Sequence, residues 1–416
     1  MSKSVVSIVK GTNAEKMVEE ALNLLGGVTN LIRPGSSVVI KPNAIGGYPP
    51  ERAGDTSPAV ISAVIKELRK AQPKEIIMAE SGGGTKDTMD SMTTNGQKKA
   101  AEDAGIDRIV DIKKEKDLIR IPIRDHRSAM EFLDLPRFLV EADHVVNLPI
   151  FKTHVSMVFT CALKNMKGIV QGLVHFQMHQ TDLVQGMLDL WSIFKSDLAI
   201  VDMIRPGEGY GPLAAMPTDF GCIVAGKDPV AVDATCCRMT GVDMWKVPFF
   251  EPAHQRGIGT YDEKEIEIRG KQIKDVYKQL WVPYLEGFGE YPEYNVISKG
   301  ACALCESLTA YSLERMIPTG DYDKNKGITI IMGKDAKPPK GVKPRDLIIM
   351  GDCVPKQYRD QGIFVWGCPP LEMFPTWPII DREVEKGPPW KRNYREETPP
   401  FLEYLKKKRE RSKKKS

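Results

Sequence analysis

The amino-acid sequence predicts an α/β fold: an open, mostly parallel sheet with helices on both faces, followed by a small C-terminal α/β unit that bears cysteines. Two observations predict it. Over roughly the first 250 residues, short β-branched runs alternate with amphipathic segments, as strands and helices do in an α/β domain. After residue 299, three short apolar runs are each followed by a glycine, as strands of a second parallel sheet would be.

The main-domain elements are expected to alternate along the chain. Six runs have strand character: Val5–Val9, Ser37–Lys41, Glu75–Ala79, His144–Leu148, Leu198–Val201 and Cys222–Ala225. Four segments have helical periodicity: Glu15–Leu25, Pro58–Lys70, Thr88–Asp103 and Thr181–Phe194. Pro58 suits the first turn of its helix, with Thr56 or Ser57 as the expected cap.

The second unit has three expected strands and two expected helices. The strands are Ile328–Met332, Leu347–Met350 and Ile363–Trp366, and the helices are Ala303–Met316 and Lys356–Gln361. Gly333, Gly351 and Gly367 then mark the carboxyl ends of parallel strands, where open sheets place their functional loops.

Composition suggests the domain boundaries. We expect residues 1–280 to form the main domain with a substrate site, 281–298 a linker, 299–375 a cysteine-bearing unit, and 376–416 an extended wrap with a basic tail. Residues 406–416 hold eight Lys or Arg and one Glu, so the rest of the chain has a net charge of −3. A nucleic-acid-binding body is therefore not expected.

The sequence shows neither a membrane-spanning run nor a signal peptide, which predicts where the protein is located in the cell. The sequence has no apolar run near the roughly 20 residues of a membrane span, and its apolar N-terminal stretch is too short and interrupted for a signal peptide. We expect a cytoplasmic protein whose eight cysteines stay reduced.

Four cysteines of the second unit form a candidate metal site. Cys302 and Cys305 form a C-x-x-C pair, Cys353 follows Gly-Asp, and Cys368 lies in Trp-Gly-Cys-Pro-Pro. Glycines that free backbone N–H groups to point at sulfur, with proline after the last cysteine, favour a [4Fe–4S] cluster. Zinc is the alternative, although the second C-x-x-C of a typical structural zinc site is missing. Non-ligand thiols are a third interpretation, and it is the favoured one for the remaining cysteines, Cys161, Cys222, Cys236 and Cys237.

Lysines at expected strand ends form a candidate substrate site. Lys41-Pro-Asn43 follows one strand, and Lys152-Thr-His154 and Lys164-Asn-Met-Lys167 follow another. If these strands are neighbours, the ammonium groups would bind an anion or lower one another's pKa. We expect Lys152, His154 and Lys164 to be catalytic, and Lys41, Asn43, Asn165 and Lys167 to bind substrate. The alternative is that each lysine is simply solvated at its strand end.

Three further motifs are weaker evidence for a binding site. Ser81-Gly-Gly-Gly-Thr85 and Gly207-Glu-Gly209-Tyr-Gly211 could turn N–H groups toward an anion, but neither is a nucleotide-binding fingerprint. His175 and His179 would share one helical face as a possible metal pair, although solvent-facing histidines explain them as well.

Several of these motifs together resemble domain-of-unknown-function family 362. They are Lys41-Pro-Asn43, Asp55-Thr-Ser-Pro58, Lys152-Thr-His154, Leu163-Lys-Asn-Met-Lys-Gly168, Ile200-Val-Asp202 and Lys227-Asp-Pro-Val-Ala-Val-Asp233, within about residues 38–270. The resemblance implies the main fold and an iron–sulfur protein, because members are widely labelled so, but it implies no particular reaction. Many members carry a C-x-x-C-x-x-C-x-x-x-C-P run, which is absent here. In its place this chain has the dispersed set Cys302, Cys305, Cys353 and Cys368.

These expectations lead to three hypotheses about function. The first is an iron–sulfur oxidoreductase that passes electrons from the C-terminal cluster to a small anionic substrate in the main domain. The second is a non-redox lyase or isomerase acting on a carboxylate, with a structural metal centre. The third is an iron–sulfur carrier or assembly protein. A ferredoxin-type electron donor is an expected partner of the first, with the basic tail either steering an acidic donor or simply solvated.

Overall fold

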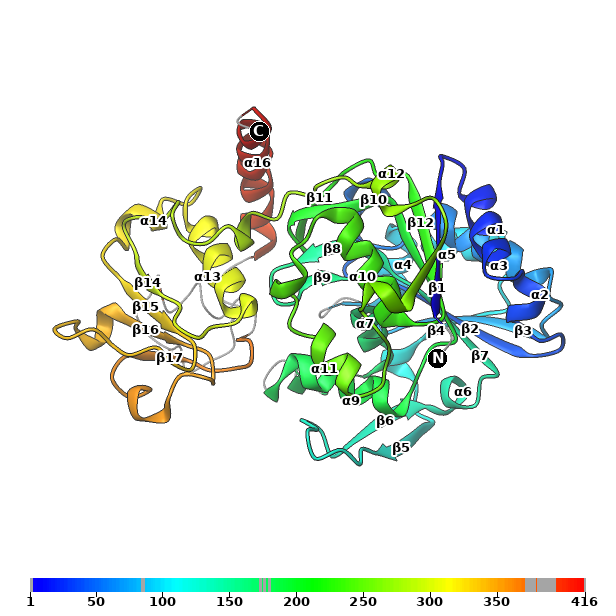
Figure 1. The fold of residues 1–416 in the computed structure, drawn as a ribbon, viewed down its shortest axis with the longest axis horizontal. Helices are drawn as coiled ribbons and strands as arrows, with labels where there is room; N and C mark the ends of the chain where they lie inside the picture. The colour runs from blue at the N-terminus through cyan, green and yellow to red at the C-terminus, as the bar shows by residue number, and fades with distance from the viewer. Residues whose placement is uncertain are drawn as a thin grey trace.

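A large twisted sheet forms the centre of the main domain (Figure 1). The computed structural model describes residues 3–83, 87–171, 174, 177, 178, 181–370, 379 and 394–414. The sheet has eleven strands, eight of them in the order β13-β1-β12-β10-β7-β2-β3-β4. Neighbours from β10 to β4 pair in parallel, whereas β12 is antiparallel to β1 and β10. The predicted open, mostly parallel sheet is therefore confirmed.

The strands of this sheet match most of the predicted runs. They are β1 (Ser4–Lys10), β2 (Ser37–Pro42), β3 (Glu75–Glu80), β4 (Arg108–Asp111), β7 (His144–Leu148), β8 (Ile150–His154), β9 (Val158–Thr160), β10 (Leu198–Tyr210), β11 (Ala214–Pro217), β12 (Cys222–Gly226) and β13 (Ile266–Gly270). A separate antiparallel pair consists of β5 (Leu118–Pro122) and β6 (Phe132–Pro136).

Helices cover both faces of the sheet. The main-domain helices are α1 (Ala14–Leu24), α2 (Val28–Leu31), α3 (Pro58–Arg69), α4 (Thr88–Thr94), α5 (Gln97–Asp103), α6 (Arg137–Val140), α7 (Ala162–Asn165), α9 (Leu183–Ile193), α10 (Pro229–Thr240), α11 (Phe250–Gln255) and α12 (Ile273–Val276). Buried residues of α1 and α3 belong to one apolar cluster, and those of α7, α9 and α10 belong to the other. Two layers of helices therefore enclose the sheet, as predicted.

One local prediction for the main domain was wrong, and another was right only for the position. The segment Thr88–Asp103 is two helices, because Gly96 between them has φ of 77°, which a helix interior does not allow. Ser57 is the N-cap of α3, as predicted, but its side chain accepts no capping hydrogen bond; the buried Asp202 carboxylate accepts the Ser57 N–H at 2.9 Å. The helix start is thus stabilised from a distant strand.

The second unit is a small parallel sheet, as the glycine-ended runs predicted. Its order is β14 (Asn295–Ile297), β15 (Thr329–Met332), β16 (Leu347–Met350) and β17 (Ile363–Val365), each pair being parallel. Helix α13 (Ala303–Met316) has the predicted bounds, and a short α14 (Asp321–Lys324) follows it. The predicted helix Lys356–Gln361 is only a 3₁₀ turn over Lys356–Tyr358.

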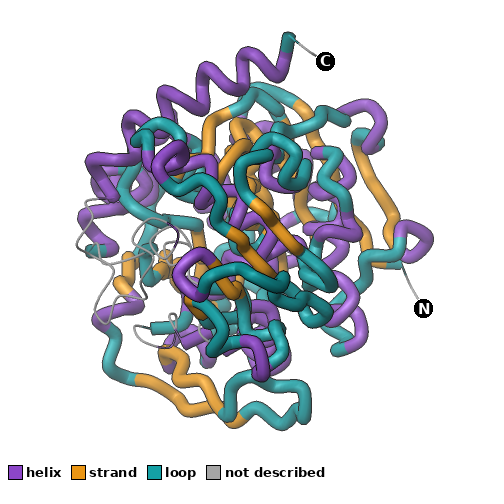
Figure 2. The backbone as a smooth tube through the Cα atoms, turned by 90° about the vertical axis from the view of Figure 1, so that its left-hand side faces the viewer, coloured by secondary structure: helices purple, strands orange, loops and turns teal. Residues whose placement is uncertain are grey.

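The segments around this unit differ from the predictions. The predicted linker 281–298 contributes β14 to the small sheet. Most of the expected extended wrap, residues 376–378 and 380–393, lies outside the described residues. The part that follows is helical, as α16 (Tyr394–Lys413), which projects from the body in Figures 1 and 2. One apolar cluster includes Tyr210 of β10, Tyr311 of α13 and Phe401 of α16, so the two units share a core. Within the described part of the chain, no helix is long and apolar enough to span a bilayer.

Candidate functional site

The chain order of the sheet reverses beside β2, and polar side chains gather there. β2 has β3 on one side and β7, a much later strand, on the other. In open α/β sheets, ligands bind in the crevice at the carboxyl ends of strands next to such a switch point. Lys41 near the end of β2 is in register with Asn147 near the end of β7. Glu80 ends β3.

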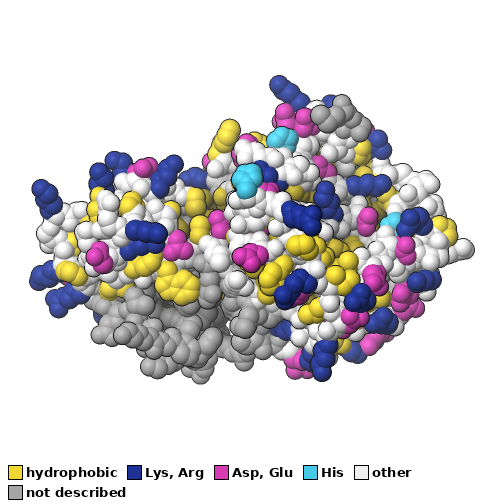
Figure 3. All heavy atoms as spheres, turned by 90° about the horizontal axis from the view of Figure 1, so that it is seen from below, with side chains coloured by type: hydrophobic (Ala, Val, Ile, Leu, Met, Phe, Trp, Pro, Cys, Tyr) yellow, Lys and Arg dark blue, Asp and Glu magenta, His cyan; other side chains and the backbone are white. Residues whose placement is uncertain are grey.

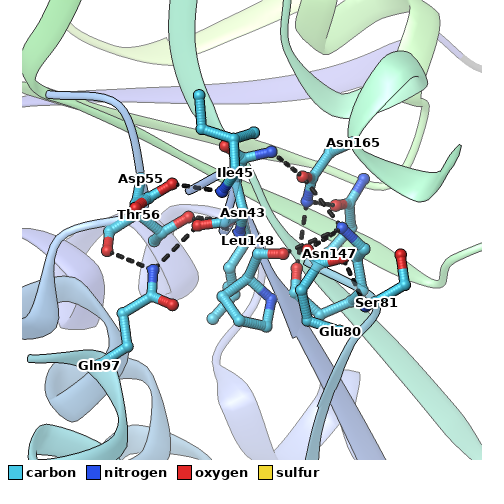
Figure 4. A network of polar contacts seen from close by, with 12 residues as sticks. Asn43, Ile45, Asp55, Thr56, Glu80, Ser81, Gln97, Asn147, Leu148 and Asn165 are labelled. Atoms are coloured by element: carbon cyan, nitrogen blue, oxygen red, sulfur yellow. Dashed lines mark hydrogen bonds and ion pairs between the residues drawn. The ribbon is translucent and has the colours of Figure 1, made fainter. Parts of the chain in front are cut away.

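Asn165 ties the loops of this crevice together. Its Oδ1 accepts hydrogen bonds from Asn43 Nδ2 at 2.8 Å and from Lys41 Nζ at 3.2 Å. Its Nδ2 donates to Asn147 Oδ1 at 2.7 Å and to the Lys41 carbonyl at 3.1 Å (Figure 4). Since α7 carries Asn165, the neighbouring lysine Lys164 is held at the same place.

Lys152 reaches the crevice from β8. Its Nζ donates to Asn43 Oδ1 at 2.6 Å and to the Gly54 carbonyl. Both Lys152 and His154 are buried. The Nδ1 atom of His154 accepts the Ser156 N–H at 3.1 Å, so a neutral imidazole carries its proton on Nε2.

One small cavity of about 60 Å³ joins these groups. All seven predicted catalytic and substrate-binding residues line it: Lys41, Asn43, Lys152, His154, Lys164, Asn165 and Lys167. The structure therefore brings the predicted residues together, while their roles stay predictions. Gly82, Gly83, Gly168 and Pro212 complete the wall and leave room for only a small ligand.

Burial sets the electrostatics of the crevice. The pKa of Lys152 is lowered to about 7, chiefly by burial; the attraction of Asp55 opposes this shift and the repulsion of Lys164 adds to it. Burial also lowers the pKa of Lys41 and raises that of Glu80, while the ion pair between them opposes both shifts. The crevice thus combines the Lys152 amine, which can gain or lose a proton near neutral pH, with more cationic than anionic side chains.

Sequence reasoning missed three residues of the site. Glu80 pairs with Lys41, and Thr160, buried on β9, lines the cavity with no hydrogen-bond partner for its Oγ1 among the described residues. Gly168 is packed so closely that a Cβ atom there would lie 2.2 Å from Glu80 Oε1 and 2.6 Å from Lys41 Nζ. The only sequence signal for Glu80 was its place directly after a predicted strand.

The four predicted metal ligands come together at the glycine-marked ends of the small sheet. Burial and then the charges of Cys302, Cys353 and Cys368 raise the pKa of Cys305. Burial raises the pKa of Cys353 and raises that of Cys368 to about 12. A metal bound among these thiols would favour their thiolate forms, because its positive charge lowers the pKa of a coordinating thiol.

The surroundings of these cysteines fit a cluster. A Cβ atom at Gly351 would lie 3.0 Å from Cys305 Sγ and 3.9 Å from Cys353 Sγ, so glycine leaves a cradle there. Cys302 and Cys353 are exposed, whereas Cys305 is buried. Among the described residues, no group of three or more His, Cys, Asp or Glu has the arrangement of a metal-ion site.

The remaining motifs have structural roles or lie outside the described residues. His175 and His179 lie outside them, as do Gly84 and Thr85 of the Ser81–Thr85 loop. Gly207–Gly211 does not form an anion loop, because β10 runs through to Tyr210. Cys161, Cys222, Cys236 and Cys237 are all buried.

Comparisons with known proteins identify relatives of the main domain. Residues 38–238 match the model of the family described as Domain of unknown function (DUF362). The thylakoid-associated protein sll1697 of Synechocystis sp. is 27% identical over 248 residues, which cover 57% of this chain and 73% of that protein.

Two solved structures resemble the chain distantly, each with 14% sequence identity. A protein from Thermotoga maritima has a TM-score of 0.34 over 53% of this chain. The chain covers 57% of the length of that protein. The lactate racemase apoprotein from Thermoanaerobacterium thermosaccharolyticum has a TM-score of 0.32, covering 88% of this chain and 87% of that one.

Proposed function

We propose that this chain, which carries a DUF362 domain over residues 38–238, is an iron–sulfur oxidoreductase that reduces a small anionic substrate. The observation that carries the proposal is the convergence of Cys302, Cys305, Cys353 and Cys368 in a unit that shares an apolar core with the domain containing the lysine-lined crevice. A ferredoxin-type protein is the proposed electron donor. A cytoplasmic location stays a prediction.

The cysteine geometry supports a cluster over zinc. Gly351 lies directly beside the Cys305 and Cys353 sulfurs, and the second C-x-x-C of a typical structural zinc site is missing from the sequence. Cys302, Cys305, Cys353 and Cys368 would hold a [4Fe–4S] cluster, which supplies electrons one at a time when bound. The exposed Cys302 and Cys353 would leave its outer edge open to a donor.

Two structural links connect the cysteines to the crevice. The Leu183 N–H at the start of α9 donates to the Cys368 carbonyl at 2.8 Å. Farther along α9, Trp191 Nε1 donates to the carbonyl of Leu163, the residue before Lys164. Helix α13, which carries Cys305, also packs against β9, which carries Thr160. These contacts support a short route between the two sites.

The crevice residues would bind the substrate and supply protons. Lys41, Lys164 and Lys167 would attract a carboxylate, because their charges exceed that of Glu80 in a buried site. Reduction of an oxo- or unsaturated carboxylate takes two electrons and two protons. The donor would supply the electrons in two successive one-electron steps, while Lys152, with a pKa of about 7, and His154, with its proton on Nε2, would each donate one proton.

A reoxidation assay tests this proposal. Protein prepared anaerobically and reduced with dithionite should be reoxidised by one member of a panel of small oxo- or unsaturated carboxylates, as followed by cluster absorbance. Lys152→Ala should slow this by at least about a hundredfold, the usual contribution of a general acid. Replacement of the exposed Lys99 on α5, Lys99→Ala, should not slow it. A cluster that no carboxylate reoxidises, or equal rates in wild type and Lys152→Ala, would contradict the proposal.

One observation also favours a lyase or isomerase. Lys152 and His154 line the same cavity, and an amine with a pKa of about 7 can remove a proton next to a carboxylate without any redox step. Exchange of solvent deuterium into a carboxylate by protein whose cluster stays oxidised would support this second function.

A further inference from the structure

Helix α16 has a packed face that holds it against the body. Phe401 and Leu405 are buried in the shared core. Tyr404 Oη and Lys408 Nζ contact Glu314 of α13 at 2.6 and 2.8 Å. Arg409 pairs with Glu208 of β10. The apolar side of the helix is therefore buried against the body, and Lys408 and Arg409 form ion pairs within the molecule.

The opposite face of its last turns is cationic and exposed. We name it the exposed basic face; it consists of Lys406, Lys407, Arg411, Lys413 and Lys414. At about 100° per residue, Lys406, Lys407 and Lys414 fall on the side of the helix away from Lys408 and Arg409, and Arg411 and Lys413 lie at the borders of that side. Lys407 and Arg411 also line a cavity together with Glu286 and Glu290 of the body. Figure 1 shows the end of α16 projecting beyond both units.

The composition of the exposed basic face indicates its partner. The other exposed residues over 406–414 are Glu410 and Ser412, so the face offers no apolar or aromatic side chain. Specific protein interfaces depend on such anchors at their centre. Binding to a fluid layer of anionic lipid needs no apolar anchor, because each lysine or arginine near the surface is attracted to the lipid headgroups independently of the others.

The position of the face argues against its steering an electron donor to the cysteines. In Figure 1, α16 runs to the top of the view, whereas β17, which precedes Cys368, is the lowest strand of its unit. Salt screens exposed charges beyond about 8 Å at physiological ionic strength. The steering role considered from the sequence alone would therefore be weak.

We propose that the exposed basic face docks the protein on anionic lipid membranes. The helix would lie against the headgroups without inserting, because its apolar side is packed on Glu208- and Glu314-bearing elements of the body. The rest of the chain, with its net charge of −3, would be repelled, which orients the molecule with α16 toward the lipid. This inference goes beyond the proposed function and does not depend on a cluster.

Vesicle flotation tests the proposal with the full chain. The protein should float with vesicles of phosphatidylcholine and phosphatidylglycerol at low salt, and not with phosphatidylcholine alone or at high salt. The triple variant Lys406→Gln, Lys407→Gln, Arg411→Gln should bind the anionic vesicles roughly a hundredfold more weakly. The matched control Lys337→Gln, Lys340→Gln, Lys343→Gln removes three exposed lysines from the second unit and should bind like wild type.

Three results would overturn the proposal. They are no flotation of wild type with anionic vesicles, equal flotation with neutral ones, and equal losses in the two triple variants. If the wild-type protein did not bind vesicles but bound an acidic ferredoxin through Lys406, Lys407 and Arg411, the exposed basic face would instead bind a protein partner. Far-ultraviolet circular dichroism of both variants separates lost binding from lost folding.

Discussion

Lys152 makes the crevice sensitive to pH. Its pKa of about 7 means that its positive charge disappears above neutrality in the folded protein. The affinity for a small anion such as acetate, measured by calorimetry, should therefore fall by up to about tenfold per pH unit above pH 7. In Lys152→Gln the affinity should be low and nearly independent of pH in this range. An equally steep pH dependence in that variant would assign the effect to another group.

The same lysine has a predictable effect on stability. In the unfolded chain it stays protonated up to its ordinary pKa of 10.5, so between about pH 7 and 10.5 the unfolded state binds more protons. The contribution of Lys152 to stability therefore rises with pH across that window. Urea unfolding of wild type and Lys152→Met should show the smaller rise in the variant.

The buried pair of Lys41 and Glu80 should be costly to break. Glu80→Gln leaves the Lys41 ammonium buried without its counter-charge, and such changes cost about 3–5 kcal/mol. Urea unfolding measures this loss. The control is Glu102→Gln, in an exposed pair with Lys98 on α5, and it should cost at most about 0.5 kcal/mol. Comparable losses in both variants would show that Glu80 does not compensate a buried charge.

The ligand assignment separates the cysteines into two groups. Cys305→Ala or Cys368→Ala should bleach the cluster of anaerobically prepared protein, because a missing thiolate leaves an iron exposed to solvent. Cys236→Ala, at a buried position on α10, should leave the visible spectrum unchanged. Full bleaching in Cys236→Ala would refute the assignment.

At the scale of elements, α16 should connect the two units through individual side chains. Lys408→Met removes a donor from the fully buried Glu314 and should lower stability by about 1–3 kcal/mol. The adjacent Lys407→Met removes only an exposed pair with Glu403 and should change stability by about 0.5 kcal/mol or less. Unfolding by guanidinium compares the two variants, and equal values would contradict this role of α16.

Periodicity predicted the elements whose stability is local. α13 and β7 have their predicted bounds, because each is bounded by apolar pattern and turn residues in its own segment. The short β14 and the helical α16 were missed because their stability comes from distant partners: Thr329 opposite Asn295, and Glu314 beneath Tyr404. Local sequence carries little trace of such contacts.

For the whole molecule, strand-end positions in the sequence predicted which lysines would lie close together. They did not predict the counter-charge and the close packing that surround these lysines. Lys41, Lys152 and Lys164 lie in one crevice because the strand ends of an open sheet converge. Glu80 and the close packing at Gly168 could not be predicted, since both depend on the register between β3 and the loop after α7. Cys353 and Cys368 were predicted to lie at strand ends from the glycines that precede them, and Cys302 and Cys305 were singled out by their C-x-x-C spacing.

The central claim is that Cys302, Cys305, Cys353 and Cys368 hold one [4Fe–4S] cluster beside a substrate crevice. Iron and acid-labile sulfide analysis of protein purified without oxygen tests it most directly. The account predicts brown protein with about four iron and four sulfide per chain. Colourless protein that contains one zinc and no sulfide would contradict it, and would make the second unit a structural zinc domain.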